Sequence, residues 1–248
     1  MEIQGKNALV TGGARRVGRA ISLELAKAGV NIAVNYNYSE DDASNTICEA
    51  EKFGVRALKV KADISNIDQV LQMVDMVYQG LGSIDFLILN AAPFIRTPFP
   101  VEKLEDWHTV INTMVNGSFY CVNTIAPLMK QNGGGVIIFI LDLSAFEPMR
   151  NYIAHSIGKA SMLAMFKQLA VELAPIIRVN AVAPGQILPP EHFNEEKIKK
   201  SAHKNLLEKW GTTGDVTDTV LFLLKSDFIT GEVLVVDGGE RLGHRRKN

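Results

Sequence analysis

Three side chains that can hold or move a proton recur at helical spacing in the second half of the chain. Tyr152, His155 and Lys159 are three, four and seven residues apart, so they share one face of a helix. Asp142 ends the apolar run Val136–Leu141 shortly before them. A carboxylate within hydrogen-bond reach of an imidazole holds one ring nitrogen and favours the imidazolium, which leaves the other nitrogen to donate. The pattern therefore predicts that Asp142 and His155 form an acid pair beside a lysine cation.

Two other interpretations of these residues stay open. His155 could be a helix histidine that Asp142 satisfies without any turnover. Tyr152 could serve as the proton donor instead, but two helical turns, about 10.5 Å of axial rise, separate it from Lys159. We therefore expect Tyr152 to be a packing residue.

A glycine turn near the start of the chain predicts a phosphate site. The apolar run at residues 8–10 breaks at Thr11, and helical spacing restarts after Gly18, so a strand leads through the turn into a helix. Such a turn lets backbone N–H groups and the positive helix end approach an anion. Arg15 and Arg16 stand where the helix dipole disfavours cations, so a bound anion would relieve a local cost. Alternatively, the glycines could be there for steric reasons only, and the two arginines could be solvated surface residues.

The residue about 20 positions beyond this turn indicates which dinucleotide the fold would prefer. NAD-binding folds commonly place Asp or Glu there to hold the ribose 2′-hydroxyl, whereas this chain has Asn37. Position 37 therefore carries no carboxylate that would repel a 2′-phosphate. Together with Arg15 and Arg16, Asn37 favours NADP(H).

Strand and helix patterns alternate along the chain, which predicts an α/β fold with a parallel sheet. The predicted strands cover residues 8–10, Val30–Asn35, Val55–Lys61, Ile84–Leu89, Val136–Leu141, Ile177–Val182 and Val233–Val236. One predicted helix follows Gly18, and the others cover about Glu40–Phe53, Asn66–Tyr78, Leu104–Lys130, Tyr152–Ala174 and Val216–Leu224. Asp63 and Asn90 come just after two strands, where ligands bind in open parallel sheets, although each could be a turn residue.

Composition excludes several classes of function. The chain has 248 residues, is 47% hydrophobic and shows no linker, so we expect one domain over residues 1–248. Its net charge of -1 provides no field for nucleic acid, and no apolar run is long enough for a membrane span or a signal peptide. Cys48 and Cys121 lack metal-ligand spacing, so we expect buried free thiols and no metal site. These features favour a cytoplasmic protein.

Five motifs, in this order along the chain, resemble those of the short-chain dehydrogenase/reductase family over essentially its whole length. They are TGGARRVG at Thr11, ADI at Ala62, NAA at Asn90, IRVNAVAPG at 177–185 and TGEVLVVDGG at 230–239. The resemblance implies a three-layer, doubly wound Rossmann-type fold of seven mainly parallel strands. It also implies a homotetramer built on the two long helices, which agrees with the apolar second face of the helix after Tyr152.

The resemblance assigns a set of cofactor-binding positions. It implies that Asp63 contacts the adenine, Asn90 the ribose side and Ile187 the nicotinamide amide. The full implied set is Gly12, Arg15, Arg16, Val17, Gly18, Asn37, Ser39, Asp63, Ile64, Asn90, Ala91, Lys159, Pro184, Gly185 and Ile187.

The chain departs from the family pattern at four positions. Arg16 replaces a glycine, and Asp142 stands where the family has its catalytic serine; both are similar to the NADPH-dependent pteridine reductase branch. The tyrosine of the YxxxK signature is His155, and the helix asparagine of the proton relay is Met114, which we expect in the core. Lys159 keeps the family residue.

Two functions follow from these residues. The first is an NADPH-dependent oxidoreductase that uses Asp142, His155 and Lys159 to reduce a pterin- or dihydrofolate-like molecule or a carbonyl compound such as a 3-oxoacyl group. The second is a catalytically impaired NADP(H)-binding sensor or structural subunit. The polar segment Pro189–Lys209, within residues 188–210, is expected to be a lid that sets the substrate.

Overall fold

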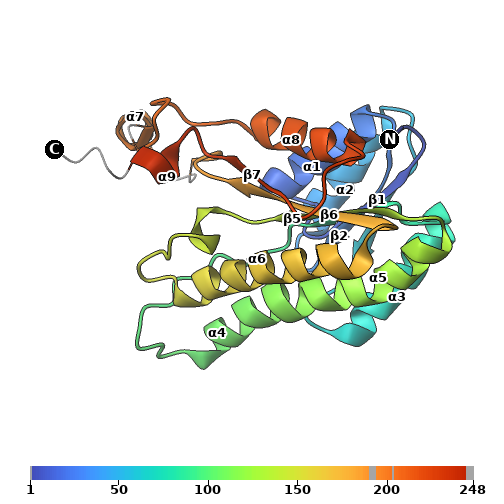
Figure 1. Ribbon diagram of the computed structural model, residues 1–248, viewed down its shortest axis with the longest axis horizontal. Coiled ribbons are helices and arrows are strands. Elements are labelled where there is room, and N and C mark those ends of the chain that lie inside the picture. Colours follow the sequence, from blue (N-terminus) through green and yellow to red (C-terminus); the bar gives the residue numbers. More distant parts are fainter. Residues whose placement is uncertain (1, 190–193, 203, 244–248) are drawn as a thin grey trace.

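Seven parallel strands form one sheet in the order β3-β2-β1-β4-β5-β6-β7 (Figure 1). The computed structural model describes residues 2–189, 194–202 and 204–243. The strands are β1 Asn7–Val10, β2 Asn31–Tyr36, β3 Ala57–Lys61, β4 Phe86–Leu89, β5 Gly135–Ile140, β6 Ile177–Pro184 and β7 Val233–Val236. The predicted α/β class with seven parallel strands is confirmed. The strand order reverses between β1 and β4, so a crevice opens beyond the carboxyl ends of these two strands.

Helices cover both faces of the sheet and bury its two apolar sides (Figure 1). One face carries α1 Arg16–Lys27, α2 Glu40–Glu51 and α8 Thr213–Lys225. The other carries α3 Ile67–Leu81, α4 Leu104–Ile111, α5 Ser118–Gln131 and α6 Ile153–Leu173. Two short helices, α7 Glu195–Ala202 and α9 Glu240–Gly243, lie near the carboxyl edge. Central strands such as β4 and β5 are buried on both faces, which explains their unbroken apolar sequences.

The helical run predicted over Leu104–Lys130 contains a π-helical segment. Residues Asn112–Gly117 form η1 between α4 and α5. Met114 lies in this segment and is fully buried, so its predicted place in the core is confirmed. A Cβ atom built on Gly158 of α6 would lie 3.0 Å from the Met114 sulfur, so η1 and α6 approach each other closely.

The predicted lid is described only in part. Residues 190–193 and 203 lie outside the described residues, and α7 occupies much of the remainder. The Leu207 N–H donates to the Gly238 carbonyl at 3.2 Å, and the Asn205 side chain donates to the Lys209 carbonyl at 2.8 Å. The end of the segment therefore packs on the turn that follows β7. None of the helices in the described part of the chain is long and apolar enough to span a bilayer.

Candidate active site and dinucleotide cleft

The glycine turn after β1 is folded tightly against the next loop. A Cβ atom on Gly18 would lie 2.2 Å from the Gly12 carbonyl oxygen, so no larger residue fits there. The Asn90 amide donates to the carbonyl oxygens of Thr11 and Gly12, both at 3.0 Å. Asn90 therefore ties the loop after β4 to the glycine turn.

Asn35 is a structural support of this turn that the sequence analysis did not identify. It lies inside β2, is buried, and accepts a hydrogen bond from the Gly12 N–H through Oδ1 at 3.2 Å. Its amide donates to the Ala62 carbonyl at 3.0 Å. An asparagine within a strand rich in Ile and Val could have revealed this support, because a buried side-chain amide needs hydrogen-bond partners.

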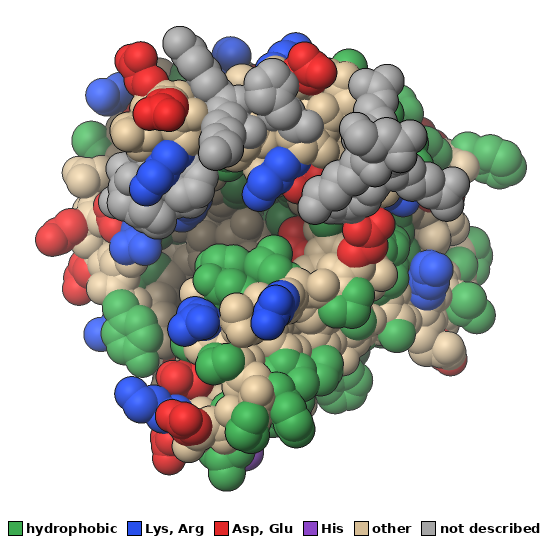
Figure 2. All heavy atoms as spheres, turned by 90° about the vertical axis from the view of Figure 1, so that its left-hand side faces the viewer, with side chains coloured by type: hydrophobic (Ala, Val, Ile, Leu, Met, Phe, Trp, Pro, Cys, Tyr) green, Lys and Arg blue, Asp and Glu red, His purple; other side chains and the backbone are tan. Residues whose placement is uncertain are grey.

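A cleft of about 900 Å³ opens beside the glycine turn. Figure 2 looks onto this end of the molecule and shows a hollow there, with hydrophobic side chains on one margin. The predicted cofactor residues that line the cleft are Gly12, Arg15, Arg16, Val17, Gly18, Asn37, Asp63, Ile64, Asn90 and Ala91. Those outside its lining are Ser39, Lys159, Pro184, Gly185 and Ile187. The tertiary structure thus gathers residues from the ends of β1, β2, β3 and β4.

One wall of the cleft comes from the helical run that begins at Leu104, for which the sequence predicted a part in the tetramer but none in the cleft. Its lining residues are Glu105, His108, Thr109, Asn112 and Thr113. Spacings of three, four, seven and eight residues from Glu105 place them on one helical face, so this periodicity could have revealed the wall.

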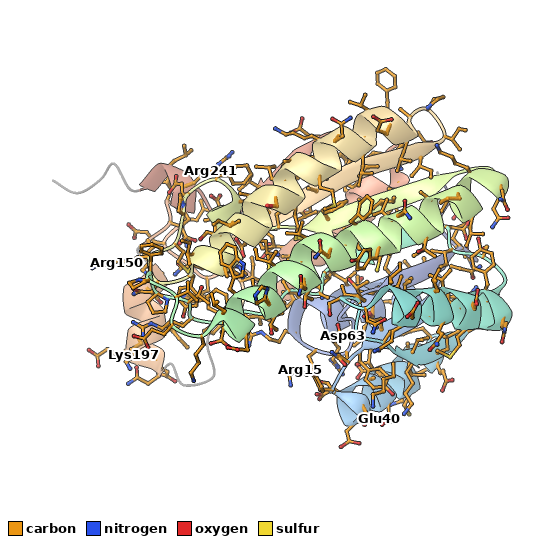
Figure 3. All side chains as sticks on the ribbon, turned by 90° about the horizontal axis from the view of Figure 1, so that it is seen from below. Arg15, Glu40, Asp63, Arg150, Lys197 and Arg241 are labelled. Carbon is orange, nitrogen blue, oxygen red and sulfur yellow. The ribbon has the colours of Figure 1, made fainter. Side chains whose placement is uncertain are left out.

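The two arginines of the turn bring positive charge to the cleft. The Arg15 Nε atom lies 3.9 Å from Asp42 Oδ2, a loose contact between exposed groups. Arg16 makes no ion pair or hydrogen bond within the described residues and has a φ of 50°, the left-handed region that favours glycine. Figure 3 shows Arg15 and Asp63 at the same margin of the molecule, where both line the cleft. A strained arginine without a partner in the described part of the chain fits a role in binding an anion.

Asp142 and His155 form the predicted pair at the carboxyl end of β5. His155 Nε2 lies 2.7 Å from Asp142 Oδ2, and the imidazole is buried. The Ser144 N–H donates to Asp142 Oδ1 at 2.8 Å, and the Ser144 hydroxyl donates to the same oxygen. Burial alone would raise the pKa of the Asp142 carboxyl, but the hydrogen bond from His155 and the nearby Lys159 charge lower it from 3.8 to about 2. Asp142 is therefore an ionised carboxylate at neutral pH.

The second nitrogen of His155 is not left free, which differs from the expectation above. Nδ1 lies 3.3 Å from the Pro93 carbonyl oxygen, so both ring nitrogens face acceptors. Only the doubly protonated ring can donate to both. The Phe94 ring meets the imidazole edge-on at 4.9 Å and stacks on Tyr152 at 4.4 Å. Tyr152 is thus a packing residue, as predicted.

Lys159 is buried one turn further along α6. Its ammonium donates to the Ile140 carbonyl at 2.7 Å, its only hydrogen bond among the described residues. Burial lowers the pKa of this ammonium, and the Asp142 carboxylate opposes that shift. The lysine cation therefore stabilises negative charge on Asp142 through space.

The remaining predicted positions lie at the end of β6. The Gly185 N–H donates to the Val236 carbonyl at 2.9 Å, and Ile187 is buried. Between them, Gln186 Oε1 is buried without a hydrogen-bond partner in the described structure. The Leu141 N–H donates to the Val182 carbonyl at 2.8 Å, so β6 lies beside β5. The loop that follows β6 is therefore adjacent to the end of β5, where Asp142 lies.

Comparison with known proteins places this architecture in a family. The family described as enoyl-(acyl carrier protein) reductase matches residues 12–240, and 3-oxoacyl-[acyl-carrier-protein] reductase FabG of Staphylococcus epidermidis is 34% identical over 242 residues, with 94% of this chain and 98% of that protein covered. The chain belongs to the classical short-chain dehydrogenase/reductase family. It is an oxidoreductase of that family.

Solved structures of the short-chain dehydrogenase/reductase family share the whole fold. Acetoin dehydrogenase from Enterobacter cloacae superposes with a TM-score of 0.90 at 30% identity, over 99% of both chains. A blue fluorescent protein from a metagenomic library, in complex with NADPH, superposes with a TM-score of 0.87 at 30% identity, over 97% of this chain and 99% of that chain. Homologues in the family bind NAD(P)(H).

The residues of this chain fit such a dinucleotide. The cleft is large enough for one, since ligand sites commonly enclose about 300–1,000 Å³. Arg15, whose contact with Asp42 is loose, and Arg16, which has no partner among the described residues, both line the cleft and can donate to phosphate. By contrast, no group of three or more His, Cys, Asp or Glu side chains in the described ranges could hold a metal ion. Cys121 is a buried free thiol, as predicted, whereas the free thiol Cys48 is exposed, so its predicted burial was wrong.

Proposed function

We propose that this protein is an NADPH-dependent oxidoreductase that reduces a small substrate, either a pterin- or dihydrofolate-like molecule or a carbonyl compound such as a 3-oxoacyl group. The observation that carries the proposal is the arginine pair at the glycine turn. Arg15 and Arg16 line the cleft, and Asn37 leaves it without a carboxylate at the ribose position. A 2′-phosphate would meet positive charge there and no repulsion from position 37.

Two observations support the substrate classes. Phe94 is 58% exposed although it stacks on Tyr152, so it offers an aromatic face on which a planar ring can stack. The FabG relative is named for reduction of a 3-oxoacyl group, which supports the carbonyl class.

The mechanism assigns the proton to the Asp142–His155 pair. Bound NADPH supplies the hydride. His155 donates Nε2–H to Asp142, and the Pro93 carbonyl holds the proton on Nδ1, so the ring can lose its Nε2 proton and stay hydrogen-bonded as the neutral tautomer. The proton then reaches the substrate through Asp142, whose side chain is 30% exposed. Lys159 stabilises the carboxylate that Asp142 regains.

A turnover assay tests this function. The purified protein is mixed with NADPH or NADH and a panel of dihydropterins, dihydrofolate and 3-oxoacyl thioesters, and cofactor oxidation is followed by absorbance. We expect oxidation of NADPH with at least one substrate class and much slower oxidation of NADH. Faster turnover with NADH across the panel would contradict the proposal.

A second function is favoured by the burial of the imidazole. His155 is only 3% exposed and both of its nitrogens are occupied, so it cannot touch a substrate without a shift of the Pro93 loop. We infer that a catalytically impaired NADP(H)-binding sensor or structural subunit is the alternative. A change in NADPH fluorescence on binding, with no oxidation by any member of the panel, would support it. Turnover would exclude it.

A further inference from the structure

The Asp142 carboxylate uses its two oxygens unequally. Oδ1 accepts hydrogen bonds from the Ser144 N–H at 2.8 Å and from the Ser144 hydroxyl. Oδ2 accepts from His155 Nε2 at 2.7 Å and from no other group in the described part of the chain. An ionised carboxylate offers about four lone pairs, two on each oxygen. Ser144 therefore fills Oδ1, and Oδ2 keeps one acceptor position free.

Only one of the two bonds from Ser144 depends on its side chain. Asp142 precedes the short 3-10 helix η2, Leu143–Ala145, and its side chain caps this helix by accepting from the Ser144 N–H. An aspartate that bonds the backbone two residues further on is common in turns, and any residue other than proline at position 144 would supply that N–H. The hydroxyl is an additional donor that the turn does not require.

The Ser144 hydroxyl has no hydrogen-bond partner besides Asp142 among the described residues. Ser144 is buried and lines a cavity of about 340 Å³, to which Phe146, Ile153 and Ile157 contribute apolar side chains. A buried hydroxyl needs an acceptor, and the recorded one is Asp142 Oδ1. The contact between Ser144 and Asp142 is therefore specific.

We propose that Ser144 is a positioning residue for the reaction, because its hydroxyl fills Oδ1 and fixes the carboxylate plane so that Oδ2 faces both His155 and the substrate. The Asp142 side chain is 30% exposed, which leaves room for a substrate contact at Oδ2. Groups that hold a reacting side chain in one orientation raise the rate, since a small misplacement is costly. The inference rests on the proposed function, in which the proton reaches the substrate through Asp142.

The charges around Asp142 agree with this role. Burial raises the pKa of its carboxyl, whereas the hydrogen bond from His155, the Lys159 charge and the hydrogen bond from Ser144 lower it. The Ser144 hydroxyl thus acts on the same ionised carboxylate as the two cationic partners of α6.

Three variants separate the hydroxyl from its surroundings. Ser144→Ala removes the hydroxyl and keeps the backbone N–H. Ser144→Thr restores a hydroxyl, and the cavity provides space for its additional methyl group. Ser156→Ala is the matched control, because Ser156 is a second buried serine of the same cavity, and its hydroxyl accepts from the Met149 N–H at 3.0 Å without contacting Asp142.

Steady-state kinetics with NADPH and the panel of dihydropterins, dihydrofolate and 3-oxoacyl thioesters measures the effect. We expect Ser144→Ala to lower kcat about ten- to hundredfold, the usual range for one hydrogen bond to a charged group, with little change in KM. Ser144→Thr should recover most of kcat, and Ser156→Ala should behave as wild type.

Proton NMR of the His155 Nε2–H reports on the carboxylate without any substrate. A ring proton in a short hydrogen bond to a carboxylate resonates far downfield, and loss of the resonance in Asp142→Ala assigns it. We expect Ser144→Ala to broaden or remove this resonance, because the carboxylate is less firmly held and the proton exchanges faster. Ser144→Thr and Ser156→Ala should keep it.

The outcomes distinguish the positioning role from the function on which it rests. A wild type that turns over, together with an unchanged kcat or an unchanged resonance in Ser144→Ala, would refute the role and leave the function standing. Equal losses in Ser144→Ala and Ser156→Ala would also overturn it, because they would reflect the cavity and not the bond to Asp142. A wild type that oxidises NADPH with no member of the panel would refute the role and the function together.

Discussion

Arg16 combines an unfavourable backbone conformation with a side chain that has no ion pair or hydrogen bond among the described residues. Its φ of 50° lies where glycine is favoured, and the resemblance to the family places a glycine at this position. Arg16→Gly should therefore leave the melting temperature unchanged or raise it, because glycine adopts this conformation without steric cost. The same change should weaken NADPH binding about ten- to hundredfold, the value of one charge-assisted contact, and leave NADH binding nearly unchanged.

Fluorescence titration with both cofactors checks this prediction. Arg19→Ala is a matched control, since Arg19 pairs with Glu49 and does not line the cleft. Equal affinities of the wild type for NADPH and NADH would contradict it.

Asp142 and His155 should behave as one functional unit. Each single alanine variant should lower kcat by roughly 10²- to 10⁴-fold, the usual contribution of a positioned general acid, and the double variant should be little worse. His155→Tyr, which restores the family signature, should keep measurable turnover. Activity in His155→Tyr together with none in the wild type would mean that the chain retains the cofactor site and has lost the chemistry.

The lowered pKa of Asp142 predicts a pH-dependent contribution to stability. A carboxyl whose pKa falls from 3.8 to about 2 on folding stabilises the native state above pH 3.8, and this contribution is lost as the pH falls toward 2. Asp142→Asn should therefore be less stable than wild type at pH 6, and the difference in unfolding free energy should narrow below about pH 4. Urea unfolding of both proteins at several pH values measures this difference in unfolding free energy. A difference that stays constant between pH 6 and pH 3 would refute the assignment.

The element with the least tolerance for change is the turn from β1 into α1. Gly18→Ala would place a methyl group 2.2 Å from the Gly12 carbonyl oxygen and 2.5 Å from the Asn90 amide nitrogen. We expect a loss of NADPH binding and a destabilisation of about 1–3 kcal/mol, since two backbone segments must separate. Gly214→Ala is the control, because it meets only the Thr212 hydroxyl at 3.3 Å in the first turn of α8. Thermal melts and NADPH titrations of both variants decide between a local and a general effect.

At the scale of the whole molecule, α5 and α6 expose apolar side chains that the monomer does not cover. Val171 is 75% exposed, and a hollow of about 260 Å³ between the two helices is lined by Phe119, Val122, Asn123, Ala126, Pro127, Lys130, Leu169 and Leu173. We expect a homotetramer that buries this face. Val171→Asp should reduce the mass measured by light scattering, whereas Met76→Asp on α3 should not. A monomeric wild type at micromolar concentration would remove the hypothesis.

Local sequence patterns predicted much of this molecule because their causes are local. The glycine turn needs a strand before it and a helix after it, and Asp63 and Asn90 follow strands whose carboxyl ends must meet at one edge of a parallel sheet. Helical periodicity alone placed His155 and Lys159 on one face, and the carboxylate at Asp142 lies 2.7 Å from His155 as the pairing required.

Only the tertiary structure decided the contacts between segments far apart in the chain. The Pro93 carbonyl occupies the second nitrogen of His155, and no spacing in the sequence relates these residues. Asn35 supports Gly12 from a neighbouring strand, and the Asn90 amide ties the loop after β4 to the same turn. The physical reason is that hydrogen bonds and burial depend on which surfaces pack together, whereas periodicity reports only which face of one element a residue occupies.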